Sequence, residues 1–432
     1  MLDIRFIREN ADLVQQAAQQ KGYQVNIAEL LSSDERRREL QQKADELRTR
    51  RNEVSSQMKG GKPAPELIEE GKVIKTELAE VEDHLRVVDE EFTRLLKAVP
   101  NMPEEDVPVG ASEDENVVFK TVGDKPEFDF APKNHAEIAA IKGWLDKDRA
   151  AKVAGSRFAY VMGDMVKLQI AIEQFVINTL TDEAKIREIA ESAGLGHISM
   201  KPFIPVLPPL MIKTEAYDQM DRLEPRDDRY KIEGEELWLQ GSAEHVLGSM
   251  HAGEIFEEKD LPLRYLGFAT SFRKEAGTYG KDMEGIIRMH QFDKLEMESF
   301  ATADTSRDEH LLFVAIQEYL LQALKLPYQV LLKCTADIGK PNARGVDMEV
   351  WLPGQSKYRE THTADYMTDY QSRRLQTRVR RNGGVKLVHT NDATAFALGR
   401  AMVAIIENYQ TADGDVVVPE ALRPYLGGRE LI

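Results

Sequence analysis

The sequence predicts an α+β protein that begins with an N-terminal antiparallel helical coiled-coil arm. Three observations lead to this prediction. Apolar residues between positions 34 and 98 recur in alternating steps of four and three. Strand-like segments then cluster with few helices between them, which favours an antiparallel or mixed sheet over a doubly wound parallel one. A hairpin at 272–300 alternates charged or aromatic side chains with apolar ones.

Composition limits the classes of protein to which the chain can belong. Its 432 residues suggest two or more domains, and a hydrophobic share of 42% suffices for a globular fold. The single cysteine, Cys334, excludes a disulfide framework and indicates a reducing, cytoplasmic setting. We expect no membrane partner, because the sequence has no long apolar run. The net charge of -17 argues against indiscriminate nucleic-acid binding, although a local basic stripe can still bind RNA.

The predicted arm occupies about residues 34–98 and consists of two helices of about 30 residues joined by a Gly/Pro turn. Its apolar seam runs from Leu40 to Met58 and restarts at Leu67 after the turn. The first helix has an excess of arginines. A solvated face with i,i+4 ion pairs is the ordinary interpretation, but the excess also fits phosphate contacts. The candidate RNA contacts are Arg36, Arg37, Arg48 and Arg50.

A segment rich in proline and acidic residues, 99–112, ends the arm and separates an N-terminal domain (1–112) from a larger domain (113–432). The larger domain has no P-loop and no dinucleotide-binding glycine motif, so a nucleotide must be held in another way. Within it the patterns predict helices at 155–181, 304–324 and 392–409, and strands at 203–211, 236–240, 263–272, 286–297, 328–333, 347–352 and 385–389.

The hairpin at 272–300 is the most informative part of the larger domain. A period of two places Arg273 and Glu275 on one strand face, and residues 277–285 supply the turn. On the returning strand the side chains that share a face are His290, Phe292, Lys294 and Glu296. A cavity lined by these groups would suit a nucleotide and a small polar molecule.

Three further clusters carry polar groups: 241–244, 359–363, and 391–394 followed by Arg400. Taken singly, each is more often a surface residue or an ion pair. The histidines lack metal-binding spacing, so structural roles are expected for them. Paired carboxylates also occur in glycosidases, but that chemistry needs no arginines in the same cavity. Arginine in a dry pocket more often marks phosphate or carboxylate.

Taken together, these segments resemble bacterial-type seryl-tRNA synthetases over essentially the whole chain. The resemblance implies a class II synthetase catalytic domain at 113–432, a tRNA-binding domain at 1–112, and a homodimer. It implies L-serine, ATP and tRNA(Ser) as substrates and Mg²⁺ as the metal, and leaves open whether tRNA(Sec) is charged too. The matching segments are MLDIRFIREN at the start, FRKEAG and HQFDKLE in the hairpin, TDYQSRR at 368–374, ALGRAMVAIIENYQ at 397–410 and VPEALRPY at 418–425.

The resemblance also implies roles for individual residues. Arg273 would grip the α-phosphate of ATP and the serine carboxylate, and Arg400 would lie by the γ-phosphate; these two are the catalytic candidates. Two other ATP-binding candidates are Glu275, which would accept from the adenine amino group, and Phe292, which would stack on adenine. The remaining ATP-binding candidates are Met289, Glu360 and Thr363. Glu360 and Thr363 would also hold Mg²⁺. Serine would be bound by Ser242, Glu244, Arg273, Glu296 and Thr394.

One segment departs from the family pattern. At 360–365 the family usually shows several serines, whereas this chain has His362 and Asp365, so their roles stay open. Asp392 and Phe396 also stand where the family is often smaller. Two rival functions remain: a related adenylating ligase on the same fold and, motivated by His362 and Asp365, a catalytically altered paralogue that acts as a tRNA-binding protein.

Overall fold

The computed structural model describes residues 1–59, 64–276 and 284–432, and the chain divides into two compact units, Met1–Met102 and Pro103–Ile432. Residues 103–112, which the sequence assigns to the first domain, are bonded to the second unit. The amide of Glu104 donates to the Ala343 carbonyl at 2.8 Å, and the amide of Gly110 donates to the Thr335 hydroxyl at 3.2 Å. Most of the predicted turn at 277–285 lies outside the described residues.

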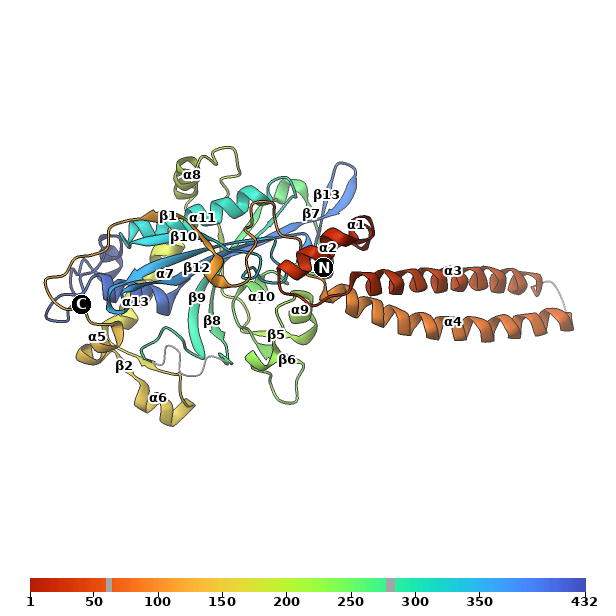
Figure 1. Cartoon of the computed structure of the whole chain (residues 1–432), viewed down its shortest axis with the longest axis horizontal. Helices are drawn as coiled ribbons and strands as arrows, with labels where there is room; N and C mark the ends of the chain where they lie inside the picture. Colours follow the sequence, from red (N-terminus) through yellow and green to blue (C-terminus); the bar gives the residue numbers. More distant parts are fainter. Residues whose placement is uncertain (60–63, 277–283) are drawn as a thin grey trace. The chain divides into compact units, whose positions relative to one another are not determined.

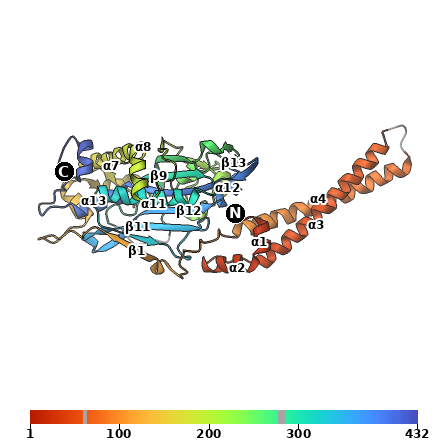
Figure 2. The same cartoon turned by 90° about the horizontal axis from the view of Figure 1, so that it is seen from above.

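The first unit consists of two short and two long helices. The long ones lie side by side and antiparallel in both views (Figures 1 and 2). The first long helix begins before the predicted position 34, because the Asn26 side chain caps it by accepting from the amide of Glu29 at 3.1 Å. The helices are α1 (Ile4–Glu9), α2 (Ala11–Gln20), α3 (Ile27–Gln57) and α4 (Pro65–Ala98).

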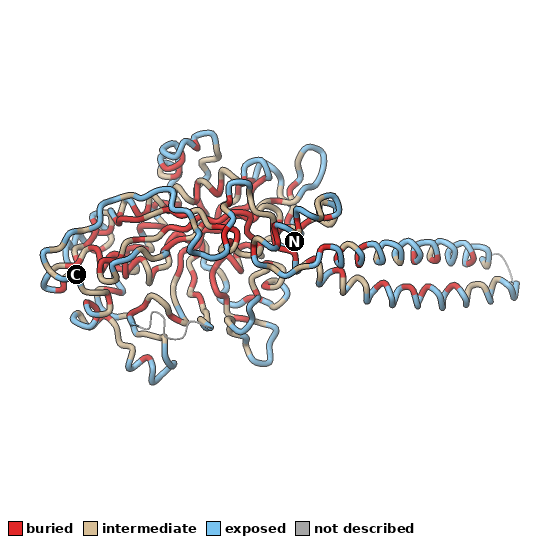
Figure 3. Tube along the Cα trace, viewed as in Figure 1, coloured by how far each residue is buried: buried red, intermediate tan, exposed pale blue. Residues whose placement is uncertain are grey.

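The seam between α3 and α4 is the apolar stripe that the sequence predicts. Buried residues lie on the facing sides of the two helices, whereas the residues of their outer faces are exposed (Figure 3). Gly71 occupies a crowded point of the seam, where a Cβ would lie 3.4 Å from the Met58 methyl group. The buried cluster contains Ala44, Leu47, Val54, Ile74, Leu78 and Val81.

The second unit is built on an eight-stranded sheet, which confirms the α+β prediction. All neighbouring strands are antiparallel except β4 and β8, which are parallel. In order across the sheet the strands are β1 (Val117–Val122), β10 (Tyr328–Leu332), β11 (Arg344–Leu352), β12 (Lys357–Thr368), β15 (His389–Ala397), β9 (Gln291–Ala301), β8 (Leu263–Phe272) and β4 (Ile204–Val206).

The two faces of this sheet differ in polarity. On one face apolar side chains such as Leu295 and Met297 pack in a core with α7 (Asp164–Leu180), α11 (Ser306–Ala323) and α13 (Leu398–Asn408). The alternate residues of β9, Lys294 and Glu296, point to the opposite face, where the short helix α10 (Glu244–Leu247) contacts β8 and β9. This polar face carries the candidate site.

Three elements of the second unit differ from the sequence prediction. The strand predicted from 286 begins only at Gln291. The segment from Asp392 to Ala397 is strand β15 rather than the start of a helix, because it pairs with β12 and β9 in the middle of the sheet. The helix predicted from 155 begins only at Asp164, because Gly163 precedes it with a φ of 63°, in the left-handed region.

Shorter elements surround the sheet. None of the helices in the described ranges is long and apolar enough to cross a membrane. The remaining helices are α5 (His135–Lys142), α6 (Lys147–Ala154), α8 (Glu183–Ser192), α9 (Thr214–Gln219) and α12 (Tyr370–Leu375), and the remaining strands are β2 (Leu145–Asp146), β3 (Tyr160–Val161), β5 (Met211–Lys213), β6 (Leu237–Leu239), β7 (Ile255–Glu257), β13 (Arg378–Arg381) and β14 (Gly384–Leu387).

Candidate active site

A cavity of about 120 Å³ opens on the polar face of the sheet, between the β8–β9 hairpin, β12 and the start of α13. A more open groove of about 470 Å³ adjoins it and shares four of its residues, including Arg273 and Arg400. The structure therefore brings all the predicted ATP-site residues to one cleft. Those that line the cavity are Arg273, Glu275, Met289, Phe292, Glu360, Thr363 and Arg400, with Thr394 from the predicted serine site.

Arg273 is fixed in this cleft through its Nε. That atom donates to the Gly241 carbonyl at 2.9 Å, and the guanidinium carbon lies 5.4 Å from the centroid of the Phe292 ring. The two Nη groups form no hydrogen bond with any described residue, so they remain available to an anion. Arg273 and Glu275 do not share a strand face, which corrects the sequence prediction, because β8 ends at Phe272 and Glu275 has a φ of 52°.

Arg400, in the first turn of α13, faces Glu360 of β12. Its Nη1 donates to the Glu360 carbonyl at 2.8 Å and to the Glu360 carboxylate at 2.9 Å. Burial alone would raise the pKa of Glu360, but Arg400 and Lys333 together lower it to about 2. Glu360 is therefore ionised at neutral pH and presents carboxylate oxygen to the cavity.

Asp347 and Lys333 belong to the same surroundings, and the sequence did not single them out. Asp347 of β11 lies directly opposite Thr363 of β12, and Lys333 Nζ is 3.6 Å from its carboxylate. Burial raises the pKa of Asp347 to about 7, with Glu360 adding to the rise and Lys333 opposing it. The alternation of polar and apolar side chains along β11 could have indicated that Asp347 lies on the polar face.

Most of the predicted serine-binding residues are buried next to the cavity, and Lys294 contacts both the cavity and two of them. This lysine lines the cavity, donates to the Ser242 hydroxyl at 3.1 Å and forms an ion pair with Glu296 at 2.5 Å. Thr394 pairs with Glu296 across β15 and β9. Ser242, Glu244 and Glu296 are buried and do not line the cavity itself. Lys294 is a site residue that the sequence placed on the right face but assigned no role.

The two residues whose roles the sequence left open lie on opposite faces of β12. Nδ1 of His362 and the Thr361 hydroxyl form a hydrogen bond of 2.8 Å, and the His362 ring packs against Phe396 in the core. Burial lowers the pKa of His362 to about 3, so the ring is neutral. Asp365 lies on the polar face, 3.9 Å from the guanidinium of Arg222. The two are therefore not partners.

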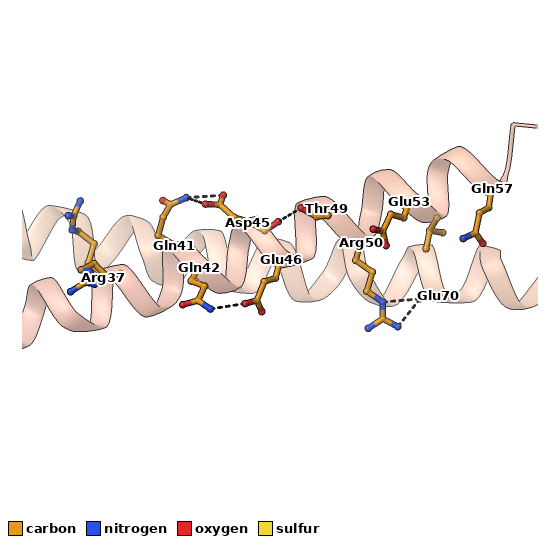
Figure 4. A pocket seen from close by; sticks show the side chains of 12 residues that line it. Arg37, Gln41, Gln42, Asp45, Glu46, Thr49, Arg50, Glu53, Gln57 and Glu70 are labelled. Atoms are coloured by element: carbon orange, nitrogen blue, oxygen red, sulfur yellow. Dashed lines mark hydrogen bonds and ion pairs between the residues drawn. The ribbon is translucent and has the colours of Figure 1, made fainter.

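Residues of α3, together with Glu70 of α4, line a shallow groove of about 850 Å³, shown in Figure 4. All four predicted RNA contacts are ion-paired within the first unit. The pairs are Arg36 with Glu91, Arg37 with Asp34 and Asp89, Arg48 with Asp45 and Glu82, and Arg50 with Glu70. Among the described residues of α3, the basic side chains that are exposed and form no ion pair are Arg38, Lys43 and Arg51.

Known proteins match both units. Residues 1–103 match the seryl-tRNA synthetase N-terminal domain, and residues 229–409 match the class II tRNA synthetase core domain (G, H, P, S and T). The serine–tRNA ligase of Syntrophobacter fumaroxidans is 39% identical over 439 residues, which cover 100% of each chain.

Two solved structures are similar over the whole chain. The seryl-tRNA synthetase of Pyrococcus horikoshii, complexed with ATP, has a TM-score of 0.88 at 35% identity and covers 100% of this chain and 99% of its own. The cytoplasmic serine–tRNA ligase of Naegleria fowleri, in complex with AMP, has a TM-score of 0.85 at 27% identity and covers 100% of this chain and 98% of its own. The chain belongs to the serine–tRNA ligase family of class II aminoacyl-tRNA synthetases.

Proposed function

We propose that the chain attaches L-serine to tRNA(Ser) in two ATP-dependent steps, through a seryl-adenylate. The observation that best supports this proposal is one cleft that holds both Arg273, whose Nη groups can donate to an anion, and the ionised Glu360. Lys294 lines the same cleft and contacts the buried Ser242 hydroxyl. The relatives support ATP as a substrate, because the Pyrococcus protein was solved with ATP and the Naegleria protein with AMP.

In the first step the serine carboxylate attacks the α-phosphorus in line and pyrophosphate leaves, so no protein nucleophile is required. The free Nη groups of Arg273 hold the α-phosphate and the serine carboxylate in reach of each other. Within the part of the chain that the structure describes, Arg400 uses only Nη1, towards Glu360, so its Nε and Nη2 can bind the γ-phosphate. Catalysis then comes from positioning and from stabilisation of the charge that develops on the phosphate.

The adenine ring lies on Phe292, beside Met289, and its amino group donates to Glu275. Magnesium fits the donor set of this cleft, because Glu360 and Thr363 offer a carboxylate and a hydroxyl, the hard oxygen ligands that the ion prefers. When bound, Mg²⁺ would neutralise charge on the departing phosphates.

Serine is selected by its hydroxyl, through Ser242, Glu296 and Thr394, with Glu244 beside them. Buried groups made to hydrogen-bond a hydroxyl penalise alanine, because alanine leaves them unpaired. Burial raises the pKa of Glu296 well above its ordinary value, with Glu244 and Asp392 adding to the rise and Lys294 opposing it. Lys294, 2.5 Å away, is the cation that faces this carboxyl group.

In the second step the terminal ribose hydroxyl of tRNA takes the seryl group from the adenylate. The domain at 1–112, with its arm, contacts the tRNA backbone, as is usual for recognition of double-stranded RNA. We also propose a cytoplasmic homodimer. The single cysteine, Cys334, fits a reducing compartment. A second copy of the chain would cover exposed apolar side chains at the β4 edge and on α7: Ile204, Leu207, Val166 and Ile170.

Amino-acid-dependent exchange of pyrophosphate into ATP tests the proposal, with a panel of amino acids. We expect serine to support exchange far better than alanine, threonine or cysteine. Preference for another amino acid would indicate a different adenylating ligase. Absence of exchange with every amino acid, together with tight tRNA binding, would indicate a catalytically altered tRNA-binding paralogue.

A further inference from the structure

His245 is a buried histidine of the short helix α10, and each of its ring nitrogens faces a polar group. The residue is only 2% exposed. Nδ1 accepts from the amide of Gly241 at 3.2 Å, and Nε2 lies 3.3 Å from the carboxylate of Glu244. Because an amide group only donates, Nδ1 carries no proton and the ring proton is on Nε2, towards Glu244. The lone pair of Nδ1 is therefore committed to Gly241.

Gly241 in turn holds Arg273. Its carbonyl accepts from Nε of Arg273 at 2.9 Å, so this one residue is bonded to His245 through its amide and to Arg273 through its carbonyl. Little room is left around it, because a Cβ at this position would lie 3.2 Å from Nη1 of Arg229, 3.2 Å from Cε1 of His245 and 3.3 Å from the Tyr217 hydroxyl. The position of the carbonyl that orients Arg273 therefore depends on the His245 ring.

Backbone hydrogen bonds fix the residue before Gly241. The carbonyl of Gln240 accepts from the amide of Phe272, at the end of β8, at 2.9 Å, and the amide of Gln240 donates to the Leu210 carbonyl at 3.0 Å. The ring of His245 is packed by Tyr217, with 4.8 Å between the ring centroids. Gln240 thus ties the segment to the sheet, whereas His245 supplies a side-chain acceptor for the residue that meets Arg273.

We propose that His245 is a positioning residue for the adenylation step: through the amide of Gly241 it sets the carbonyl that orients Arg273. This inference rests on the proposed function, in which Arg273 brings the α-phosphate and the serine carboxylate together. A displacement of about 1 Å in a catalytic group can cost about 10²-fold in rate, so a small shift of this carbonyl is enough to slow the reaction. The effect belongs in kcat, because it concerns the alignment of substrates that are already bound.

Two amide substitutions separate this role from a merely structural one. In His245→Asn the side-chain oxygen takes the place of Nδ1 and can still accept from Gly241, whereas in His245→Gln the amide group takes the place of Nε2 and leaves Gly241 without that acceptor. Both variants are compared with the full-length wild type in serine-dependent pyrophosphate exchange. The rate is measured at saturating serine and ATP, so that a change in serine binding through Glu244 does not enter it.

The matched control is His310→Gln. His310 is also buried, at 0% exposure, and its Nε2 is bonded to Arg344 Nη1 at 2.9 Å, away from the cleft. We expect His245→Gln to lower kcat by about tenfold or more, and His245→Asn and His310→Gln to keep it within about threefold of the wild type. Circular dichroism verifies that each variant is folded.

A double-mutant cycle with Arg273→Ala tests the route of the effect. If His245 acts by orienting Arg273, His245→Gln should lower kcat no further once the Arg273 side chain is gone. If His245→Gln does not fold, Gly241→Ala takes its place in the cycle, because its added methyl group displaces the His245 ring from the other side. It should lower kcat in the wild type and leave it unchanged in Arg273→Ala.

Equal rates for His245→Asn and His245→Gln, whether both normal or both low, would overturn the proposal. So would a loss in the Arg273→Ala background as large as the loss in the wild type. In each of these cases serine-dependent exchange by the wild type leaves the proposed function standing. If the wild type itself shows no serine-dependent exchange, the proposed function fails, and the role of His245 fails with it.

Discussion

Arg273→Ala is the most direct test of the adenylation chemistry. The side chain is held by the Gly241 carbonyl at 2.9 Å and lies over Phe292, so its unused Nη groups are already oriented before substrate arrives. Removing one preorganised donor to a developing negative charge costs about 3–4 kcal/mol, or about 10²–10³-fold in rate. Two donors are lost here, but they act on one reacting centre and do not add in full. We therefore expect serine-dependent exchange to fall at least about 10²–10³-fold, in kcat and not only in KM.

The assay is pyrophosphate exchange at saturating serine and ATP, followed by measurement of each KM. Arg273→Lys should recover no more than a small part of the rate, because lysine keeps the charge but not the two-pronged geometry. Arg380→Ala is the surface control: its ion pair with Glu257 at 3.3 Å is exposed, and its loss should leave the rate unchanged. An alanine variant that retained more than about a tenth of the wild-type rate would refute the role given to Arg273.

Three other predictions concern pH, the arm and tRNA. Burial raises the pKa of Asp392 to about 7, above the ordinary value of 3.8, so the folded chain keeps a proton that the unfolded chain has lost. Stability from this group therefore falls as pH rises from 5 to 8, and the calorimetric Tm of wild type minus that of Asp392→Asn should fall with it; a constant difference would contradict this. Leu78→Ala in the arm seam should cost about 2–5 kcal/mol of the arm's stability by circular dichroism and leave exchange intact, whereas an unchanged unfolding curve would show that the seam is not packed as described. Glutamine at Arg38, Lys43 and Arg51 together should weaken tRNA binding and reduce the slope of log affinity against log salt by about 2–3, and a similar loss from the ion-paired Arg48→Gln alone would contradict that ranking.

The arm could be predicted because its signal is local. A heptad seam needs only the spacing of apolar residues along one helix, and Ala44, Leu47 and Leu78 are buried where the spacing places them. The start of α3 was missed although Asn26 is a recognisable cap, since the apolar stripe alone was used to set the boundary. Ion pairing on the arm was not predictable in detail, because pairs such as Arg50 with Glu70 join two helices whose register the sequence does not state.

Most strands of the catalytic unit could be predicted from the sequence, but the side-chain contacts between those strands could not. The pattern at 392–397 predicts helix, because small and apolar residues such as Ala393, Ala395 and Ala397 suit both periods. Only the pairing of this segment with β12 and β9 makes it a strand. Lys294 was on the correct face, but its contact with Ser242 depends on a segment 52 residues away in sequence. Such side-chain contacts follow from tertiary structure and not from spacing.

Three buried carboxylates of the large sheet show the same limit most clearly. Asp365, Asp392 and Glu298 lie far apart in the sequence, each in an alternating strand, and nothing local indicates that they pair across β12, β15 and β9. One-residue changes of register between these strands would move the three side chains to different faces, so their alignment is a property of the sheet as a whole. A chain that needed only stability would do better with apolar residues at these positions.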